Sequence, residues 1–211
     1  MSEIVTLHGY GGKEKHFIRL DRLNGDSIIV DVGVCEGDVI KKLREHKQTS
    51  KCKIFAIECN KRLVEMLRKQ NLFNVEICEK ALVGQGIGEK VAFFEGARGS
   101  NWGSIAPSQL KERWATAIDS YDVETFEINN IFNELGIDKI DYMKMDIEGS
   151  EKLILETMSM EVAEKIKQMT IEVHWPNLQV GITMDWAKER LIELGFEIKV
   201  KKHAEIFCER P

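Results

Sequence analysis

The chain has 211 residues, of which 43% are hydrophobic and 31% are charged, a composition that suits one globular domain with a full core. The net charge of −5 and the pI of about 5.7 argue against a nucleic-acid backbone as the main partner. No apolar run approaches the roughly 20 residues that span a bilayer, and the start lacks the pattern of a signal peptide. We therefore expect a cytoplasmic protein that does not bind membranes.

The five cysteines are odd in number and include no C-x-x-C pair. This usage favours reduced, buried thiols over a disulfide scaffold or a zinc ribbon.

Apolar, β-rich runs alternate with amphipathic segments along the first half of the chain. A first strand is expected over 27–35, followed by a helix with its apolar residues on one side. A second strand at 53–58 precedes a helix with Asn60 at its N-cap. A third strand at 75–78 leads into two extended pieces around a Gly-rich turn within 81–96.

The second half continues this alternation after an irregular stretch at 96–121, which contains a candidate helix at 110–117. The remaining predicted elements are a helix capped by Asn129 and ended by Gly136, a fourth strand within 141–151, a helix at 150–158, a fifth strand at 169–174, a helix from Thr183 to Gly195, and a hairpin formed by 196–200 and 205–208.

Strands that alternate with helices imply right-handed crossovers and a parallel sheet covered on both sides. The predicted fold is therefore α/β, a three-layer α/β/α sandwich with a C-terminal antiparallel hairpin at one edge. Residues 28–211 are expected to form this single domain. Residues 1–27 form an N-terminal extension, for which covering a cofactor and forming a homodimer contact both remain open.

The predicted fourth strand carries charges where a strand buried on both faces normally reads as nearly continuous Val, Ile and Leu. Lys144, Asp146 and Glu148 alternate there with apolar residues. An edge strand in water would explain the charges. However, ligands of open parallel sheets bind beyond the carboxyl ends of the strands. We therefore predict that these three side chains line a binding site.

A D-x-G-x-x-x-G loop ends the first predicted strand. Gly33 suits a tight turn, and Gly37 allows the next helix to approach closely. The carboxylate of Asp31 would repel a pyrophosphate but attract an amino group, such as the ammonium of S-adenosylmethionine. A purely structural glycine turn is the alternative.

A carboxylate also ends the second predicted strand. Glu58, followed by Cys59, is placed to accept hydrogen bonds from both hydroxyls of a ribose, as in dinucleotide-binding folds. A solvent-facing glutamate before a helix is the alternative. Lys80 and Ala81 follow the third strand, where the adenine edge of a nucleoside is expected.

Several motifs together resemble the FkbM family of S-adenosylmethionine-dependent methyltransferases: DVGVCEG, FAIEC, KALVG and, above all, IDYMKMDIEGSE followed by TIEVH. The resemblance spans residues 28 to about 200. Its K-x-D-x-E-G-x-E signature is specific, whereas all class I methyltransferases share the glycine loop. The resemblance implies a seven-stranded, mostly parallel Rossmann-like sheet, S-adenosylmethionine as methyl donor, and O-methylation of a hydroxyl on a small molecule or glycan.

The resemblance also assigns roles to individual residues. It matches Asp31, Gly33 and Gly37 to the cofactor loop, Glu58 to the ribose acid, Ala81 to the small residue after the third strand, and Lys144, Asp146, Glu148 and Gly149 to the signature. The predicted cofactor site also includes Cys59, Lys80 and Asp146. Two departures stand out. Val34-Cys35-Glu36 replaces A-N-[IV]-G of many relatives, and Glu127-Ile128-Asn129 replaces a frequent Leu-Asp pair.

Methyl transfer requires an acceptor oxygen in line with the methyl group and the removal of a proton. Asp146 is the first candidate for orienting or deprotonating the hydroxyl, with Lys144 keeping it ionised. Glu148 and His174 are alternative bases. Each also has a structural interpretation, Glu148 as a helix cap and His174 as a strand-end residue. A divalent metal held by this Asp/Glu/His group is conceivable but not favoured.

Two loops carry candidate substrate contacts, namely Asn101 and Trp102 in one and Trp175 in the other. A tryptophan can stack on a sugar or another ring, although a packed surface tryptophan is an equal alternative. Two other functions stay open. A nicotinamide-dependent oxidoreductase is disfavoured because G-x-G-x-x-G is absent. A non-catalytic binding scaffold stays an alternative because Val34-Cys35-Glu36 departs from the loop of many relatives. The methyl acceptor itself lies beyond fold-level reasoning.

Overall fold

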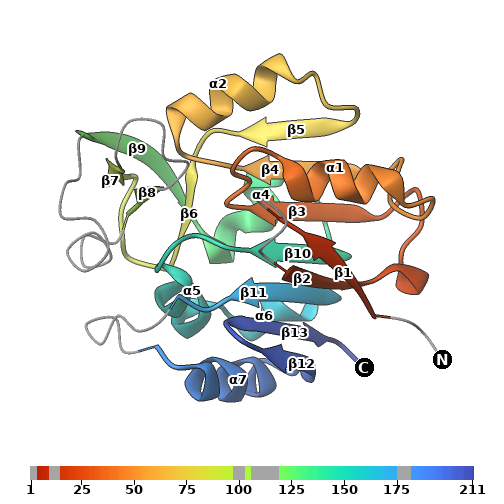
Figure 1. Ribbon diagram of the computed structural model, residues 1–211. Coiled ribbons are helices and arrows are strands. Elements are labelled where there is room, and N and C mark those ends of the chain that lie inside the picture. The colour runs from red at the N-terminus through yellow and green to blue at the C-terminus, as the bar shows by residue number, and fades with distance from the viewer. Residues whose placement is uncertain (1–3, 10–14, 97–102, 106–118, 175–181) are drawn as a thin grey trace.

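The computed structural model describes residues 4–9, 15–96, 103–105, 119–174 and 182–211 (Figure 1). The predicted helix at 110–117 and the predicted substrate contacts Asn101, Trp102 and Trp175 lie outside these residues.

The α/β expectation is confirmed, and the centre of the molecule is a mixed sheet of seven strands in the order β12-β13-β11-β10-β3-β4-β5. The five strands from β11 to β5 are parallel, whereas β13 is antiparallel to both β11 and β12. The strands are β3 (Ile28–Val32), β4 (Lys53–Ile57), β5 (Val75–Cys78), β10 (Tyr142–Met145), β11 (Gln168–Glu172), β12 (Glu197–Lys202) and β13 (Glu205–Glu209).

Helices cover both faces of this sheet (Figure 1). One face packs against α1 (Asp38–Glu45) and α2 (Lys61–Lys69). The other packs against α4 (Ile131–Leu135), which follows the 3-10 turn η3 (Ile128–Asn130), and against α5 (Glu151–Thr157), α6 (Met160–Glu164) and α7 (Met184–Glu193). Among the described residues, no helix is both long and apolar enough to cross a lipid bilayer.

The helix starts show which local signals the sequence carries. The side chain of Asn60 accepts hydrogen bonds from two backbone N–H groups of α2, and that of Thr183 accepts one from Trp186. The cap at Asn60 was predicted, and Thr183 was predicted as the start of its helix. Asn129 was predicted to cap a helix but does not do so, because its amide bonds the backbone of Thr157 and Ser159 instead.

A second, smaller sheet lies beside the carboxyl ends of the parallel strands (Figure 1). Its strands β6 (Ala81–Val83), β7 (Lys90–Glu95), β8 (Gly103–Ser104) and β9 (Asp119–Glu127) are arranged in the order β6-β9-β7-β8. The two extended pieces predicted within 81–96 are β6 and β7. β9 was not predicted, because its frequent acidic residues hide an alternating pattern with few apolar positions.

The N-terminal extension is a β-hairpin that packs on the central sheet. Strands β1 (Ile4–His8) and β2 (Lys15–Arg19) pair with each other, and the turn η2 (Leu20–Arg22) connects them to the core. Leu7 and Ile18 are fully buried in the same apolar cluster as α1. The backbone N–H groups of Phe17 and Arg19 donate to the side chains of Thr170 and Gln168 on β11. Polar residues of a central strand therefore bind the hairpin.

The hairpin also brings a buried imidazole against a buried carboxylate. His16 Nδ1 lies 3.2 Å from Glu205 Oε1 on β13. Burial, followed by the charge of Lys144, lowers the pKa of His16. Burial, followed by the charge of Asp146, raises the pKa of Glu205 to about 8. At neutral pH a large share of this pair is therefore neutral, which reduces the cost of burying it.

This pair predicts how Glu205→Gln changes the dependence of stability on pH. The folded-state pKa of Glu205, about 8, lies above its ordinary value of 4.5. Its contribution to the free energy of unfolding is therefore complete below about pH 4.5 and is lost as the pH rises through about 8. Relative to Glu205→Gln, the wild type should lose at least about 1 kcal/mol between pH 5 and pH 9.

Urea unfolding at the two pH values measures this difference. Glu89→Gln, which removes an exposed carboxylate from the turn before β7, is the matched control and should follow the wild type. A difference between wild type and Glu205→Gln that stays constant with pH would contradict the proposed neutral pair.

Candidate active site

A pocket opens at the carboxyl ends of β3, β4 and β10, as expected for an open parallel sheet. One side consists of residues 32–36, 57–60 and 146–148, which follow these three strands. The small sheet forms the opposite side through residues 80–82 and 103–105. The predicted cofactor and signature segments therefore meet around one space.

The turn at Gly33 determines how closely two of these loops approach. Gly33 has a φ of 76°, and a Cβ atom there would lie only 1.7 Å from the backbone oxygen of Asp146. Its N–H donates to the oxygen of Ile57 at 3.0 Å, and its oxygen accepts from Lys144 Nζ at 2.6 Å. Gly37, with a φ of 80°, precedes α1 and is not part of the pocket wall.

Glu58 is a buried carboxylate that faces the pocket, with 8% of the residue exposed. Its Oε2 accepts a hydrogen bond from the N–H of Cys35 at 3.1 Å, and its Oε1 accepts from the N–H of Asn60 at 2.9 Å. These bonds fix the carboxylate, while each oxygen keeps lone-pair capacity for a further donor. Burial raises the pKa of Glu58, although the two N–H donors act in the opposite direction and lower it. The solvent-facing alternative does not apply.

The far end of the pocket contains the residues predicted beside an adenine. Ala81 on β6 is buried, and Cys59 is partly buried. Burial and the Glu58 charge raise the pKa of the Cys59 thiol well above its ordinary value, so the thiol stays protonated. The ammonium of Lys80 is bound to the carboxylate of Glu134 on α4. Lys80 is therefore part of the pocket wall, and its positive charge is paired with Glu134, which lies outside that wall.

Below the pocket, Lys144 lies between two carboxylates. Its Nζ is 3.5 Å from Asp31 Oδ1 and 3.4 Å from Asp146 Oδ2, and its side chain is 3% exposed. Although burial opposes it, the charge of Lys144, followed by that of His174, lowers the pKa of Asp146. The expected pairing of Lys144 with an ionised Asp146 is therefore present.

Asp31 has a different environment from the one expected. It is 1% exposed and lies beneath the pocket, whose wall on this strand begins at Val32. Burial raises the pKa of Asp31, and Lys144 opposes this rise. Asp31 contacts Lys144 in place of the predicted direct contact with a cofactor amino group, because its side chain points to the face that the hairpin covers.

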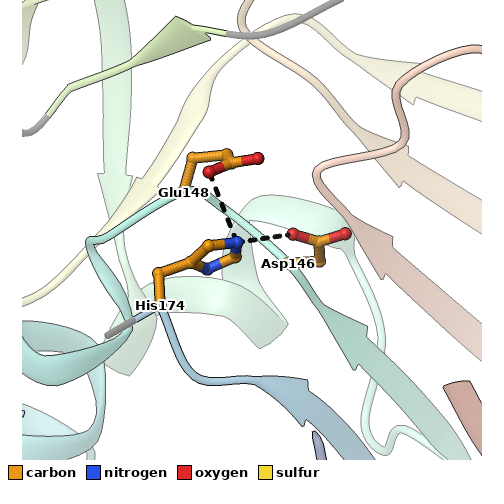
Figure 2. Close-up of side chains that lie close together, drawn as sticks. All are labelled: Asp146, Glu148 and His174. Atoms are coloured by element: carbon orange, nitrogen blue, oxygen red, sulfur yellow. Dashed lines mark ion pairs between the residues drawn. The ribbon is translucent and has the colours of Figure 1, made fainter. Parts of the chain in front are cut away.

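Three side chains converge at the edge of the pocket that we call its mouth (Figure 2): Asp146 and Glu148 belong to the pocket wall, and His174 contacts both. His174 Nε2 lies 3.3 Å from Glu148 Oε2 and 3.6 Å from Asp146 Oδ1. Glu148 has a φ of 54°, the left-handed region that costs a non-glycine residue about 1 to 2 kcal/mol. Its side chain turns to His174 and does not cap α5, which excludes the capping interpretation. His174, 8% exposed, is part of a cluster and not an isolated strand-end residue.

Glu151 completes this cluster and was not predicted as a site residue. This fully buried carboxylate lies 2.7 Å from His174 Nδ1 and accepts from the N–H groups of Ile147 and Gly149. Glu151 is the last residue of the K-x-D-x-E-G-x-E signature and the first residue of α5. Because acidic residues are common in the first turn of any helix, its type and position gave no sign of a role in the site.

The protonation of His174 follows from these neighbours. Burial alone would lower its pKa, but the carboxylates of Glu151, Glu148 and Asp146 outweigh burial and raise the pKa of His174 well above its ordinary value. This shift favours the doubly protonated imidazole at neutral pH and so argues against the general-base role considered from the sequence. Burial and the Asp146 charge raise the pKa of nearby Glu172 to about 8.

Residues 31–198 match the family model described as the Methyltransferase FkbM domain. The chain belongs to the FkbM methyltransferase family.

Relatives of this FkbM chain share part of its length. The human and rat proteins named "Probable methyltransferase-like protein 24" are 38% identical over 70 residues and 41% identical over 60 residues. These matches cover 32% and 27% of this chain but only 19% and 16% of the two relatives.

Solved structures share the fold of the FkbM chain. The FkbM methyltransferase of Methylobacillus flagellatus has a TM-score of 0.54 at 13% identity, over 88% of this chain and 44% of that one. Fibrillarin of Aeropyrum pernix, in complex with natively bound S-adenosyl-L-methionine, has a TM-score of 0.50 at 13% identity, over 90% and 69%. At such identities the likeness concerns the fold alone.

The FkbM pocket also contains three residues outside the predicted site: Gly9 and Ser104, which the sequence placed only in a candidate cofactor cover and a candidate substrate loop, and Phe93, which it did not indicate. Gly9, at the end of β1, and Phe93, on β7, lie in its wall. Ser104 lines it as well, and its hydroxyl donates to the backbone oxygen of Glu148 at 2.6 Å. Neither the small sheet nor the hairpin carries a recognised cofactor or signature motif. The packing of these two elements beside the strand ends is therefore what shows that these residues line the pocket.

Proposed function

We propose that this FkbM-family chain is an S-adenosylmethionine-dependent methyltransferase that methylates a hydroxyl oxygen of a small molecule or glycan. The observation that carries the proposal is one pocket lined by a fixed carboxylate at its inner end and by the signature carboxylates at its mouth. Family membership supports methyl transfer. The oxygen acceptor is our inference from the charged groups at the mouth.

The residues of the pocket fit the cofactor. Glu58 presents two oriented oxygens, which suits the paired hydroxyls of a ribose. The absence of a side chain at Gly33 lets the backbone approach a ligand. The small side chain of Ala81 and the apolar ring of Phe93 suit a flat nucleobase. Lys80 and Cys59 would act through the shape of the wall, whereas Gly37 lies outside the wall, directly before α1.

Asp146 is the residue we assign to the acceptor hydroxyl. Its carboxylate is kept ionised by Lys144 and is partly exposed at the pocket. When bound, S-adenosylmethionine supplies a methyl group whose bond to sulfur breaks, the electron pair staying on sulfur, as the acceptor oxygen forms the new C–O bond. Asp146 orients the hydroxyl and accepts the proton that the oxygen loses. Glu148 is the second candidate for this proton.

Calorimetric titration of the purified protein tests the cofactor. S-adenosylmethionine should bind in the micromolar range, and Glu58→Gln should weaken binding about 10-fold to 100-fold, because one charged acceptor of the ribose is lost. Glu76→Gln, which removes an exposed carboxylate on β5, is the control and should bind as the wild type does. NADH, titrated separately, should not bind.

Each other outcome favours a different function. No binding of either nucleotide would favour a non-catalytic scaffold, and binding of NADH alone would favour an oxidoreductase. Once S-adenosylmethionine binding is established, methyl-labelled donor and a panel of sugars and small hydroxyl compounds test the acceptor class. Labelling of nitrogen acceptors alone would contradict O-methylation.

A further inference from the structure

The cluster at the mouth of the pocket contains the donor atoms of a metal site. One imidazole nitrogen and one carboxylate oxygen from each of Asp146 and Glu148 all lie within 4.8 Å of one another (Figure 2). We propose that Asp146, Glu148 and His174 bind a divalent transition-metal ion at the mouth of the pocket. A metal was not favoured from the sequence; the geometry of the three side chains reverses that preference.

The imidazole is oriented as metal-binding histidines are. Its Nδ1 is bound to Glu151, a fully buried carboxylate that two backbone N–H groups hold in place. A carboxylate on one ring nitrogen fixes the ring and directs the other nitrogen to a metal, which is the usual outer-shell arrangement. His174 Nε2 accordingly faces Asp146 and Glu148.

The charges around the ring also favour a cation. Besides Asp146, Glu148 and Glu151, the carboxylate of Glu172 lies 3.8 Å from His174 Nε2. The facing cation is Lys144, which binds Asp146 through Oδ2 and leaves Oδ1 directed at the cluster. Within the part of the chain that the structure describes, four acidic side chains therefore lie near one imidazole and one ammonium, and Glu172, with a pKa of about 8, is the least charged of the four at neutral pH. A divalent ion between Asp146 and Glu148 would offset the negative charge of these two carboxylates.

The donor set indicates the class of ion. One imidazole and two carboxylates suit Mn²⁺, Fe²⁺ or Zn²⁺, whereas Mg²⁺ and Ca²⁺ prefer oxygen ligands alone. Three protein ligands leave further coordination positions open. Because Asp146 and Glu148 belong to the pocket wall, these positions face the space assigned to the acceptor, where the ion would lower the pKa of a bound hydroxyl. This use of the ion rests on the proposed function; the site itself does not.

Metal titration without any nucleotide tests the site. Protein dialysed against a chelator is titrated with MnCl₂ by calorimetry, and bound Mn²⁺ is followed through the loss of the free-ion signal in electron paramagnetic resonance. We expect one ion per chain. Glu148→Gln and His174→Gln should each weaken binding at least about 10-fold. A parallel titration with ZnCl₂ shows which ion binds more tightly.

The control is His203→Asn, because this exposed histidine has a φ of 55°, a conformation that asparagine tolerates. It should leave metal binding unchanged. Glu148→Gln is the primary variant, since Glu148 is partly exposed and its substitution spares the fold. Absence of binding to the wild type, or binding that all variants retain, would overturn the proposal. Failure of S-adenosylmethionine binding in its own titration would overturn the proposed function and leave the metal site standing.

Discussion

Gly33→Ala should lower the free energy of unfolding by about 3 to 5 kcal/mol and abolish nucleotide binding. A Cβ atom at this position would lie 1.7 Å from the backbone oxygen of Asp146 and 2.8 Å from its carbonyl carbon. The obstacle is main chain, so no side-chain rotation relieves it. The φ of 76° adds the ordinary penalty of a left-handed alanine. Urea unfolding and calorimetric titration with S-adenosylmethionine measure the two effects.

Gly86→Ala separates the close approach from the backbone penalty. Gly86 has a φ of 88°, and a Cβ atom there would meet no atom within 4 Å. Its substitution should cost only about 1 to 2 kcal/mol and leave binding intact. Equal losses for the two variants would show that the contact between the Gly33 turn and Asp146 has no energetic role.

The same glycine shows what sequence reasoning can reach. A glycine after a buried strand, followed by a carboxylate at the end of the next strand, indicates a ligand loop from residue type and spacing alone. The signal is local, since Gly33 and Glu58 each follow their own strand. The parallel arrangement of the strands then brings them to one edge. Pocket-lining residues at these strand ends were therefore predictable, and Glu58 lies in the pocket wall as expected.

Asp31 and Glu151 mark where such reasoning stops. Both belong to recognised motifs, but a motif does not state which face of a strand a side chain takes or which partner it meets. Asp31 turns toward the hairpin side, and Glu151 reaches His174 from the start of a helix. The hairpin itself was predicted only as an extension, because the long-range contacts of Phe17 and Arg19 with β11 leave no local pattern.

Lys144→Met should be the second strongly destabilising change, costing about 3 to 5 kcal/mol. It removes the ammonium that binds the carboxylates of Asp31 and Asp146 and the oxygen of Gly33. Asp31 is 1% exposed and would be left as an unpaired buried charge. Methionine retains most of the aliphatic volume, so the loss reports the charge and its hydrogen bond. Urea unfolding at neutral pH measures it.

The double variant Asp31→Asn/Lys144→Met distinguishes charge from packing. If the cost of Lys144→Met comes from the isolated carboxylate, removing that charge should recover at least about 1 kcal/mol despite the second substitution. A double variant less stable than Lys144→Met would contradict this account. Recovery of stability without recovery of S-adenosylmethionine binding would assign Lys144 a second task at Asp146, on the pocket side. The lysine in this strand would then stabilise the sheet through Asp31 and prepare the site through Asp146, which is why a central strand carries it.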